Sequence, residues 1–383
     1  MTDTTGEAAN DVIAAPESEP GPLELEVRRR LAAGGSMPVS RYMELCLAHP
    51  QHGYYVSRDP IGAGGDFITA PEISQMFGEL VGLWTVAVWR QMGSPYGLRV
   101  IELGPGRGTL MADAIRAAQS VSAFAQAMPS IHLVEISPAL RRRQAQTLAH
   151  LRQPPQWHDR LADVPPGPSI VIANEFFDAL PVHQAVRKAD GWHRRMVTLG
   201  ADGALAFTLE AQPMPHFERL LPAHLRDAHE GELFEWRTDD AGMDLGRRVA
   251  SDRGAALVID YGHLQSDTGD TLQAAARHAF SDPLRTPGLA DLTAHVDFEA
   301  LANAAAAMGA RVHGPVTQGE WLRRLGIFER ATALKENASD AQRHDIDIAL
   351  DRLTGVGRTT MGELFKVAGF AHPQLGVLPG FEQ

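Results

Sequence analysis

The feature that most constrains the fold is a glycine-rich turn within residues 100–109. A short apolar run ends at Glu102, and glycines follow at positions 104, 106 and 108. An apolar run, alternating glycines and then a helical pattern are typical of a strand, a tight turn and a helix. Because glycine lets a ligand approach bare backbone at a helix N-terminus, Glu102, Gly104, Gly106 and Gly108 are candidate contacts for a small molecule. A glycine turn without a ligand is the alternative.

The spacing of these glycines separates two classes of ligand. The dinucleotide fingerprint is Gly-x-Gly-x-x-Gly, and Thr109 stands where its last glycine would be. Glu135 closes the next apolar run 27 residues after Gly108, whereas about 20 are typical of that fingerprint. A carboxylate at this place can accept hydrogen bonds from ribose hydroxyls. The turn resembles motif I of class I S-adenosylmethionine methyltransferases, so that cofactor is favoured over a nicotinamide or a flavin.

Strand and helix patterns alternate along the chain, which predicts an α/β fold with a doubly wound sheet. Candidate strands cover residues 98–103, 131–136, 169–173, 255–260, 310–317 and 363–368, with a weaker strand around 156–158. Candidate helices cover residues 109–120, 138–151, 239–252, 297–308 and 339–353. We assign residues 96–182 and 238–370 to this core, and residues 371–383 to a C-terminal tail.

Two further regions precede and interrupt the core. Residues 23–95 carry two short helical patterns, a glycine-rich loop, and a long apolar helix that we expect to begin at Thr69 or Ala70. A helical N-terminal region with a lid is therefore predicted. Asp190-Gly191 and Asp202-Gly203 separate three strand-like runs, which indicates hairpins. We expect residues 183–237 to form an inserted β-rich subdomain.

Charge and composition limit the partners. The chain has 383 residues, is 44% hydrophobic and has a formal net charge of −12 at pH 7. This charge disfavours nucleic acid as a partner and favours a basic substrate. No apolar run is long enough to span a bilayer, so no membrane insertion is expected.

The cysteine count and the N-terminus predict the location. Cys46 is the single cysteine, so neither a disulfide nor a cysteine-bound metal is expected, and no metal site is predicted. Residues 1–22 contain five carboxylates and no Lys or Arg. This composition predicts a disordered acidic tail, unlike an Arg-rich transit peptide, and a cytoplasmic location.

Carboxylates gather after the fourth predicted strand, in residues 174–181. Glu175 and Asp178 lie three residues apart and would share one face of a helical turn. Paired carboxylates can orient a guanidinium and take the proton that it loses on methyl transfer, so both are candidate catalytic residues. Acids placed to suit a helix dipole are the alternative. Asn174, at the sheet edge where ligands gather, is a candidate cofactor contact.

Three other positions are weaker candidates. Asp260 ends the next core strand at the same sheet edge, and His295 follows it within residues 292–298. Both are candidate catalytic residues, His295 as a proton acceptor, although an isolated histidine is more often structural. Asp159 follows the third strand and would face an adenine amino group, with Trp157 either as a stacking wall or as a core residue.

Several segments taken together resemble one family, the MidA family. It includes the mitochondrial complex I assembly-factor arginine methyltransferase and its bacterial relatives. The most specific segments are Thr-Ala-Pro-Glu-Ile-Ser-Gln at residues 69–75 and Asn-Glu-Phe-Phe-Asp at residues 174–178. The likeness extends from about residue 23 to residue 370, and its segments are residues 65–75, 102–109, 173–181, 260–262 and 292–298.

The resemblance implies a class I Rossmann-like fold and S-adenosylmethionine-dependent methylation of an arginine on a respiratory complex I subunit. It also implies that Gly104, Gly106 and Glu135 hold the cofactor, while a glycine-rich lid near Asp66 and Glu72 covers it. The protein partner would be that subunit, and a homodimer is possible. Methylation of a small molecule or of another side chain remains an alternative, as does a non-catalytic assembly chaperone that binds S-adenosylmethionine.

Overall fold

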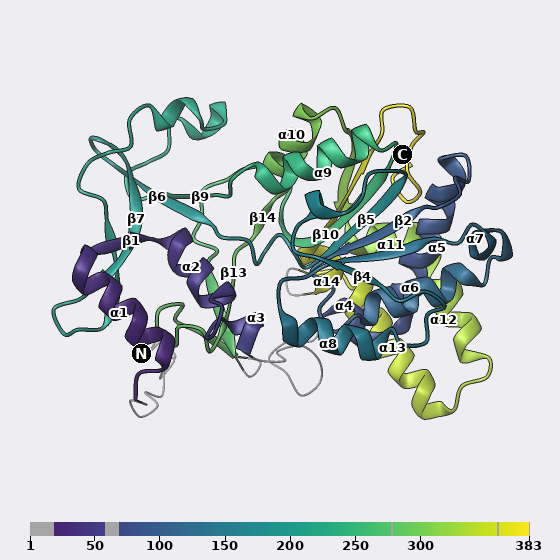
Figure 1. Ribbon diagram of the computed structural model, residues 1–383. Helices are drawn as coiled ribbons and strands as arrows, with labels where there is room; N and C mark the ends of the chain where they lie inside the picture. The colour runs from purple at the N-terminus through teal and green to yellow at the C-terminus, as the bar shows by residue number, and fades with distance from the viewer. Residues whose placement is uncertain (1–18, 58–68, 277–278, 358–359, 383) are drawn as a thin grey trace, which may run out of the picture.

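The computed structural model describes residues 19–57, 69–276, 279–357 and 360–382. They form two lobes that lie side by side (Figure 1). Among them, the core lobe comprises residues 69–182, 238–263, 296–357 and 360–382, and the second lobe comprises residues 19–57, 183–237, 264–276 and 279–295. Asp66 lies outside the described residues, so the structure does not place it.

The core lobe is built on an eight-stranded sheet with a parallel centre. Its strand order is β15-β16-β10-β5-β2-β3-β4, and β14 also pairs with β10. The parallel strands are β2 (Arg99–Leu103), β3 (Ser130–Val134), β4 (Gln156–His158), β5 (Ser169–Asn174) and β10 (Ala255–His263). The short strand β14 (Val296–Asp297) is also parallel to β10, whereas β15 (Arg311–Thr317) and β16 (Phe365–Ala371) form antiparallel pairs. The chain leaves β2 towards β3 and β4 and returns on its other side at β5, so the strand order reverses between β2 and β5.

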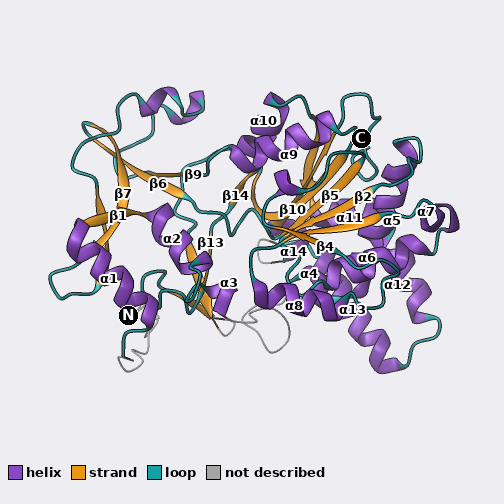
Figure 2. Ribbon diagram, viewed as in Figure 1, coloured by secondary structure: helices purple, strands orange, loops and turns teal. Residues whose placement is uncertain are grey.

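Helices cover both faces of this sheet, as Figure 2 shows. Alternate side chains of β2 pack into the hydrophobic cores on opposite faces of the sheet. Val100 belongs to one core and Ile101 to the other. Strands buried on both faces have near-continuous apolar sequences, which explains why the sequence pattern reveals them. Helices on the Val100 face include α5 (Gln75–Gln91), α6 (Thr109–Gln119) and α11 (Gln318–Arg324), and those on the Ile101 face are α9 (Asp240–Ser251) and α10 (Phe298–Ala307).

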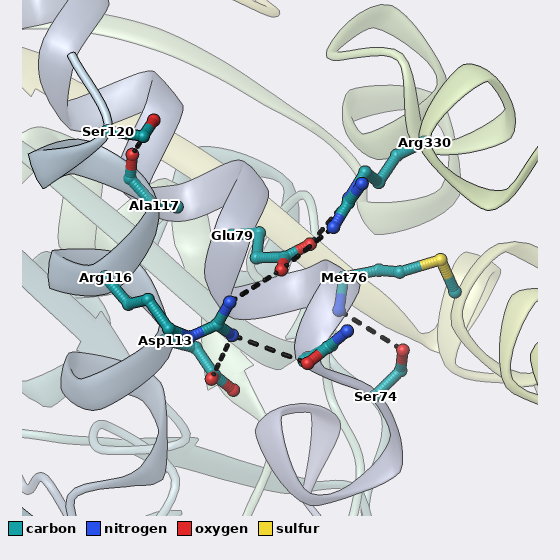
Figure 3. A network of polar contacts seen from close by, with 9 residues as sticks. Ser74, Met76, Glu79, Asp113, Arg116, Ala117, Ser120 and Arg330 are labelled. Atoms are coloured by element: carbon teal, nitrogen blue, oxygen red, sulfur yellow. Dashed lines mark hydrogen bonds and ion pairs between the residues drawn. The ribbon is translucent and has the colours of Figure 1, made fainter. Parts of the chain in front are cut away.

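Further helices complete the core lobe. They are α4 (Ala70–Ile73), α7 (Ser122–Gln126), α8 (Pro138–Thr147), α12 (Ile327–Lys335), α13 (Asp340–Thr354) and α14 (Met361–Leu364). Glu79 of α5 lies between two arginines, as Figure 3 shows. Its Oε1 accepts a hydrogen bond from Arg116 of α6 at 3.1 Å, and its Oε2 accepts one from Arg330 of α12 at 2.7 Å. Burial alone would raise the pKa of Glu79, but these two arginines lower it, so the ionised carboxylate ties three helices together.

The second lobe combines N-terminal helices and a short N-terminal strand with strands from two later segments. One sheet has the order β1-β7-β6-β9 with β8 paired to β7, and another has the order β12-β11-β13. Both sheets share an apolar core with α1 and α2 that includes Val27, Tyr42, Val197 and Leu292. The helices are α1 (Pro22–Gly34), α2 (Val39–Ala48) and α3 (Tyr54–Ser57). The strands are β1 (Ser36–Pro38), β6 (His183–Lys188), β7 (Gly191–Leu199), β8 (Leu205–Leu209), β9 (Leu233–Trp236), β11 (Gln273–Ala276), β12 (Ala279–Ser281) and β13 (Asp291–Thr293).

Three features differ from the sequence-based expectations. The long helix expected from residue 69 or 70 is broken at Ser74, whose hydroxyl accepts a hydrogen bond from the Met76 N–H and caps α5. Residues 36–38, for which no strand was expected, form a strand that pairs with β7. The expected C-terminal tail packs against the core: Leu378 is fully buried, and the Trp84 indole donates to the Pro379 carbonyl at 3.1 Å. In the part of the chain that the structure describes, no helix has both the length and the apolar character required to cross a bilayer.

Candidate active site

A cavity of about 460 Å³ opens at the carboxyl edge of the parallel strands. Its wall includes Gly104 after β2, Glu135 after β3 and Glu175 after β5, together with Tyr55 and Asp291 from the second lobe. In doubly wound sheets, ligands bind at this edge, where the strand order reverses. The volume suits a small organic molecule, and both lobes contribute to the wall.

The glycine turn forms the wall after β2. Gly104 and Gly106 have φ angles of 59° and 52°, a region that side-chain-bearing residues rarely adopt. A Cβ atom on Gly104 would lie 3.0 Å from the Phe176 ring, so the space at this position is also restricted. Gln144 of α8 fixes the turn by donating to the Gly106 carbonyl at 2.8 Å. The turn therefore presents backbone, with no side chain, to the cavity.

Gly108 and Thr109 serve the start of α6. Gly108 has a φ angle of 83° and is the N-cap residue of that helix, and it does not line the cavity. The Thr109 hydroxyl donates to Glu72 at 2.6 Å. Glu72, expected to belong to a lid, is thus bonded to the first residue of α6 and is also absent from the cavity wall.

Glu135 supplies a carboxylate after β3. Its Oε1 accepts a hydrogen bond from the Ser137 N–H at 2.8 Å, and its Oε2 accepts one from Gln144 at 3.1 Å. Burial raises the pKa of Glu135, although these hydrogen bonds act in the opposite direction. The same Gln144 amide nitrogen also donates to Gly106, so one side chain positions the glycine turn relative to this carboxylate.

Glu175 and Asp178 form the acidic part of the wall. Glu175 has a φ of 50°, and its Oε1 accepts hydrogen bonds from the Ala70 N–H at 3.3 Å and from Asn174 at 3.1 Å. Burial and then the negative charge of Asp178 raise the pKa of Glu175 to about 7. Burial raises the pKa of Asp178 to about 6, against the opposing charge of Arg237. The Oδ1 atom of Asp178 is buried and has no hydrogen-bond partner among the described residues.

Two residues expected to be catalytic, Asp260 and His295, do not line this cavity. Both carboxylate oxygens of Asp260 accept hydrogen bonds from backbone N–H groups. Its Oδ2 accepts from Phe177 and Asp178 at 2.9 and 3.2 Å, and its Oδ1 accepts from Tyr261. Asp260 therefore holds the segment that carries Asp178. His295 lines a separate cavity of about 60 Å³, and its ring packs edge-on against Tyr261. We correct both expectations, because position at a sheet edge does not fix where a side chain points.

The weaker cofactor candidates also differ in placement. Asp159 lies at the exposed rim of the cavity and forms an ion pair with Arg141 at 2.6 Å. Trp157 packs against the core and donates to Gln144 at 2.8 Å, so it is not a wall of the cavity. Glu102 and Asn174 are buried and do not line the cavity, and burial raises the pKa of Glu102 to about 8. Glu102 is thus held in a site that favours its neutral form.

Sequence reasoning missed the contribution of the second lobe. Tyr55 of α3 and Asp291 of β13 both line the cavity, and the Tyr55 hydroxyl lies 2.9 Å from each Asp291 carboxylate oxygen. The two residues are 236 positions apart, so no local spacing indicates their proximity. Thr293 and Tyr261 also belong to the wall. The nearest signal in the sequence is the family-like segment at residues 292–298, whose Thr293 lines the cavity.

The chain matches known methyltransferases over most of its length. Residues 80–316 match the family described as "Putative S-adenosyl-L-methionine-dependent methyltransferase". The protein arginine methyltransferase NDUFAF7 homolog of Drosophila melanogaster, a mitochondrial protein, is 40% identical over 91% of this chain and 85% of its own length. Its Homo sapiens counterpart, also mitochondrial, is 36% identical over 83% of this chain and 76% of its own length. The expectation of a cytoplasmic location is wrong, because these relatives are named mitochondrial.

A solved structure supports the same relationship. A protein from Burkholderia thailandensis with bound S-adenosyl-homocysteine is 32% identical and superposes with a TM-score of 0.81, covering 96% of this chain and 98% of its own. The strand order, the glycine turn and the cavity described above agree with this similarity in fold. The chain belongs to the MidA/NDUFAF7 family of S-adenosylmethionine-dependent methyltransferases.

Proposed function

We propose that the protein is a protein arginine N-methyltransferase. The observation that carries this proposal is the pair of carboxylates, half-buried Glu175 and buried Asp178, in the same cavity as the glycine turn. The relatives in fly and human are named protein arginine methyltransferases, which supports a protein substrate and the arginine side chain. An arginine entering this cavity would bring a positive charge to carboxylates that are otherwise costly to ionise.

We assign the methyl donor to the glycine side of the cavity. Gly104 and Gly106 leave room for its amino-acid end against backbone, and Glu135 can accept hydrogen bonds from ribose hydroxyls. The residues fit this group, because the turn adopts left-handed backbone angles and the cavity is large enough for a small molecule. S-adenosylmethionine supplies an electrophilic methyl group when it is bound there.

The acceptor side then needs to orient a guanidinium and remove one proton. A guanidinium is charged at neutral pH and presents planar N–H groups that match carboxylate oxygens in pairs. Glu175 and Asp178 would hold it in line with the methyl group at about 3–3.5 Å, the separation that favours transfer. One guanidinium nitrogen would form a bond to the methyl carbon as the sulfur–methyl bond breaks and S-adenosyl-homocysteine leaves. The same nitrogen would lose a proton, which a carboxylate would accept and later release to water.

Labelling of proteins tests the arginine assignment. The protein is incubated with isotopically labelled S-adenosylmethionine and a mitochondrial extract, and the modified residues are identified by mass spectrometry. We expect label on arginine side chains, and no label with the Glu175→Gln/Asp178→Asn double variant. Label confined to small metabolites, or to side chains other than arginine, would reject the proposal.

The target protein is a finer proposal. The family resemblance favours a respiratory complex I subunit, and the acidic charge of this chain suits a basic segment on that subunit. Incubation of the protein with purified complex I subunits should label one arginine-containing peptide strongly. Equal labelling of unrelated basic proteins would contradict a dedicated subunit target while leaving arginine methylation intact.

A further inference from the structure

Asn174 ends β5 and lies directly before Glu175 of the candidate active site. Its side chain is buried, does not line the cavity, and donates through Nδ2 to the Oε1 atom of Glu175 at 3.1 Å. An amide turned the other way would bring its oxygen against the carboxylate oxygen, so the donating orientation is the favourable one. Asn174 therefore acts on this carboxylate without reaching the cavity itself.

The backbone around Glu175 is anchored to the neighbouring strand β10. Asn174 lies opposite Ile259 in the parallel pairing of β5 and β10, and the Glu175 N–H donates to the Ile259 carbonyl at 2.9 Å. Glu175 has a φ of 50°, a conformation that is uncommon for a residue with a side chain. Strained backbone of this kind persists only where the surrounding contacts over-determine it, and it clusters at functional sites. The main chain thus fixes where the Glu175 side chain begins, and hydrogen bonds to its carboxylate fix where it ends.

Two donors hold the Glu175 carboxylate. Besides Asn174, the Ala70 N–H at the start of α4 donates to the same Oε1 atom, at 3.3 Å. The two sequence segments that are most specific to the family, residues 69–75 and 174–178, therefore meet at one carboxylate oxygen.

The other charged groups near Glu175 are acids. Burial and then the negative charge of Asp178 raise the pKa of Glu175 to about 7, whereas the two hydrogen bonds lower it. Burial, then Asp178 and Glu175, keep the pKa of Asp260 well above its ordinary value. Glu72, the acid of α4, accepts a hydrogen bond from Thr109 at 2.6 Å. Among these neighbours, the two donors are the groups that favour the charged form of Glu175.

The oxygen of the Asn174 amide argues against a purely structural role. This Oδ1 atom is buried and has no hydrogen-bond partner in the described part of the chain. A buried acceptor that is left unpaired costs stability, and an apolar side chain of similar size would avoid that cost. The hydrogen bond to Glu175 explains an asparagine at this position better than packing does.

We propose that Asn174 is the positioning residue of Glu175, and that its amide both orients this carboxylate and stabilises its charged form. This inference rests on the proposed function, in which Glu175 binds and deprotonates the acceptor guanidinium. Without the donor, the carboxylate would take up its proton at a higher pH. At neutral pH, fewer molecules would then carry the charge that matches a guanidinium.

Two substitutions separate this role from a structural one. Asn174→Leu keeps a similar size and removes the donor, while Asn174→Asp keeps the shape and places a second acid beside Glu175. A structural role makes Asn174→Asp the milder change, because the shape is retained. The proposed role makes it the stronger change, since one of two carboxyl groups that share a site has a strongly raised pKa. Asn303→Leu and Asn303→Asp, at an exposed position of α10 outside the cavity wall, are the matched controls.

NMR measures the charge of Glu175 without any substrate. The full chain is labelled with carbon-13 at the glutamate carboxyl carbon and titrated with acid and base, and the Glu175 signal is the one that Glu175→Gln removes. We expect its midpoint in Asn174→Leu to lie about one pH unit above that of the wild type, and in Asn174→Asp higher still. The low-pH limb of kcat/KM for an arginine peptide should move to higher pH in the same order. Both Asn303 variants should match the wild type in both measurements.

Each outcome decides the inference. An unchanged Glu175 midpoint in both Asn174 variants overturns it and leaves the arginine assignment intact. A midpoint that rises while the low-pH limb of kcat/KM stays in place also overturns it, because Asn174 would then not serve the reaction through Glu175.

Folding and basal activity are checked separately. Urea denaturation accompanies the titration, and if Asn174→Leu does not fold, Asn174→Asp carries the same test. If neither variant folds, Asn174 is structural and the inference is overturned. If the wild type methylates no arginine, the proposed function fails, and the NMR titration still decides whether Asn174 sets the charge of Glu175.

Discussion

Glu175 is half-buried and Asp178 is buried, and removal from solvent raises their pKa values to about 7 and about 6, near neutrality. If they bind and deprotonate a guanidinium, they must be ionised in the free enzyme. Their protonation at low pH removes that charge, so kcat/KM for an arginine acceptor should fall as pH decreases through about 7 to 6. Because the two groups interact, the profile reports apparent values for the pair.

The first prediction follows from this titration. A pH–rate profile between about pH 5 and pH 8.5 should rise with pH, and Glu175→Gln should lower kcat/KM by about a hundredfold or more and leave a single, lower midpoint. Steady-state rates with a labelled arginine substrate measure both effects, with Asp202→Asn, in the turn before β8 and outside the cavity wall, as a control. A wild-type profile that is flat over this range would contradict the assignment.

Arg237 connects the segment that carries Asp178 to the second lobe. Its guanidinium donates to the carbonyl oxygens of Leu180, His295, Asp178 and Ala294, at 2.7 to 3.1 Å. Its charge also opposes the rise in the pKa of Asp178 that burial causes. One side chain therefore has a structural effect and an electrostatic effect, and two substitutions can separate them.

The second prediction compares Arg237→Lys with Arg237→Met. Both lose most of the carbonyl contacts, so each should lower the free energy of unfolding by about 2–4 kcal/mol, measured by urea denaturation. Removal of the positive charge should in addition raise the pKa of Asp178. Arg237→Met should therefore move the low-pH limb of the rate profile to higher pH, whereas Arg237→Lys should leave it nearly in place. Identical profiles for the two variants would show that charge plays no part.

At the scale of elements, the central strands were predictable and some short elements were not. Strands β2, β5 and β10 are buried on both faces, so each is a nearly continuous apolar run bounded by turn residues. The break at Ser74 depends on a cap, and Ser74 follows an apolar residue within a pattern that reads as one helix. β1 has three residues, too few for any periodicity, and forms because β7 lies beside it.

In the site, as in the fold, the sequence indicates residues that follow a recognisable strand, but not contacts between residues far apart in the chain. Gly104, Glu135 and Glu175 were predictable because each follows a strand whose carboxyl end meets the others at one sheet edge. The sequence could not show that the Asp260 carboxylate would be used by backbone N–H groups. Tyr55 and Asp291 come from segments with no local motif, and tertiary folding alone brings them together.

The third prediction concerns the packing of α5 against α6. A Cβ atom on Gly82 would lie 2.1 Å from the Ala114 carbonyl oxygen, which the backbone cannot relieve without moving the helices apart. Gly82→Ala should lower the free energy of unfolding by about 1–3 kcal/mol despite the better helix propensity of alanine. Gly34→Ala, at a helical glycine with nothing within 4 Å, is the control and should be neutral or slightly stabilising. Equal stabilities of the two variants in thermal unfolding would contradict the close helix contact.

At the scale of the whole molecule, residues of both lobes line the same cavity. Its wall combines core-lobe residues such as Gly104 and Glu135 with Tyr55 and Asp291 of the second lobe. In the proposed function, the methyl donor binds on the side of the glycine turn. Binding of the donor should therefore stabilise the folded molecule even without a protein substrate.

The last prediction measures this stabilisation and its dependence on the turn. A ligand that binds the folded state at about 100 times its Kd raises the free energy of unfolding by about 2.7 kcal/mol, so S-adenosyl-homocysteine should raise the Tm by several degrees in calorimetry. Gly106→Val should eliminate this increase, because a β-branched residue disfavours the φ of 52° and its side chain would project at the turn that lines the cavity. Gly34→Val, where a Cβ meets nothing within 4 Å, should keep the full increase. The comparison uses the change on adding ligand, so a loss of basal stability in Gly106→Val does not obscure it. If Gly106→Val retained the full increase, the methyl donor would have to bind away from the glycine turn.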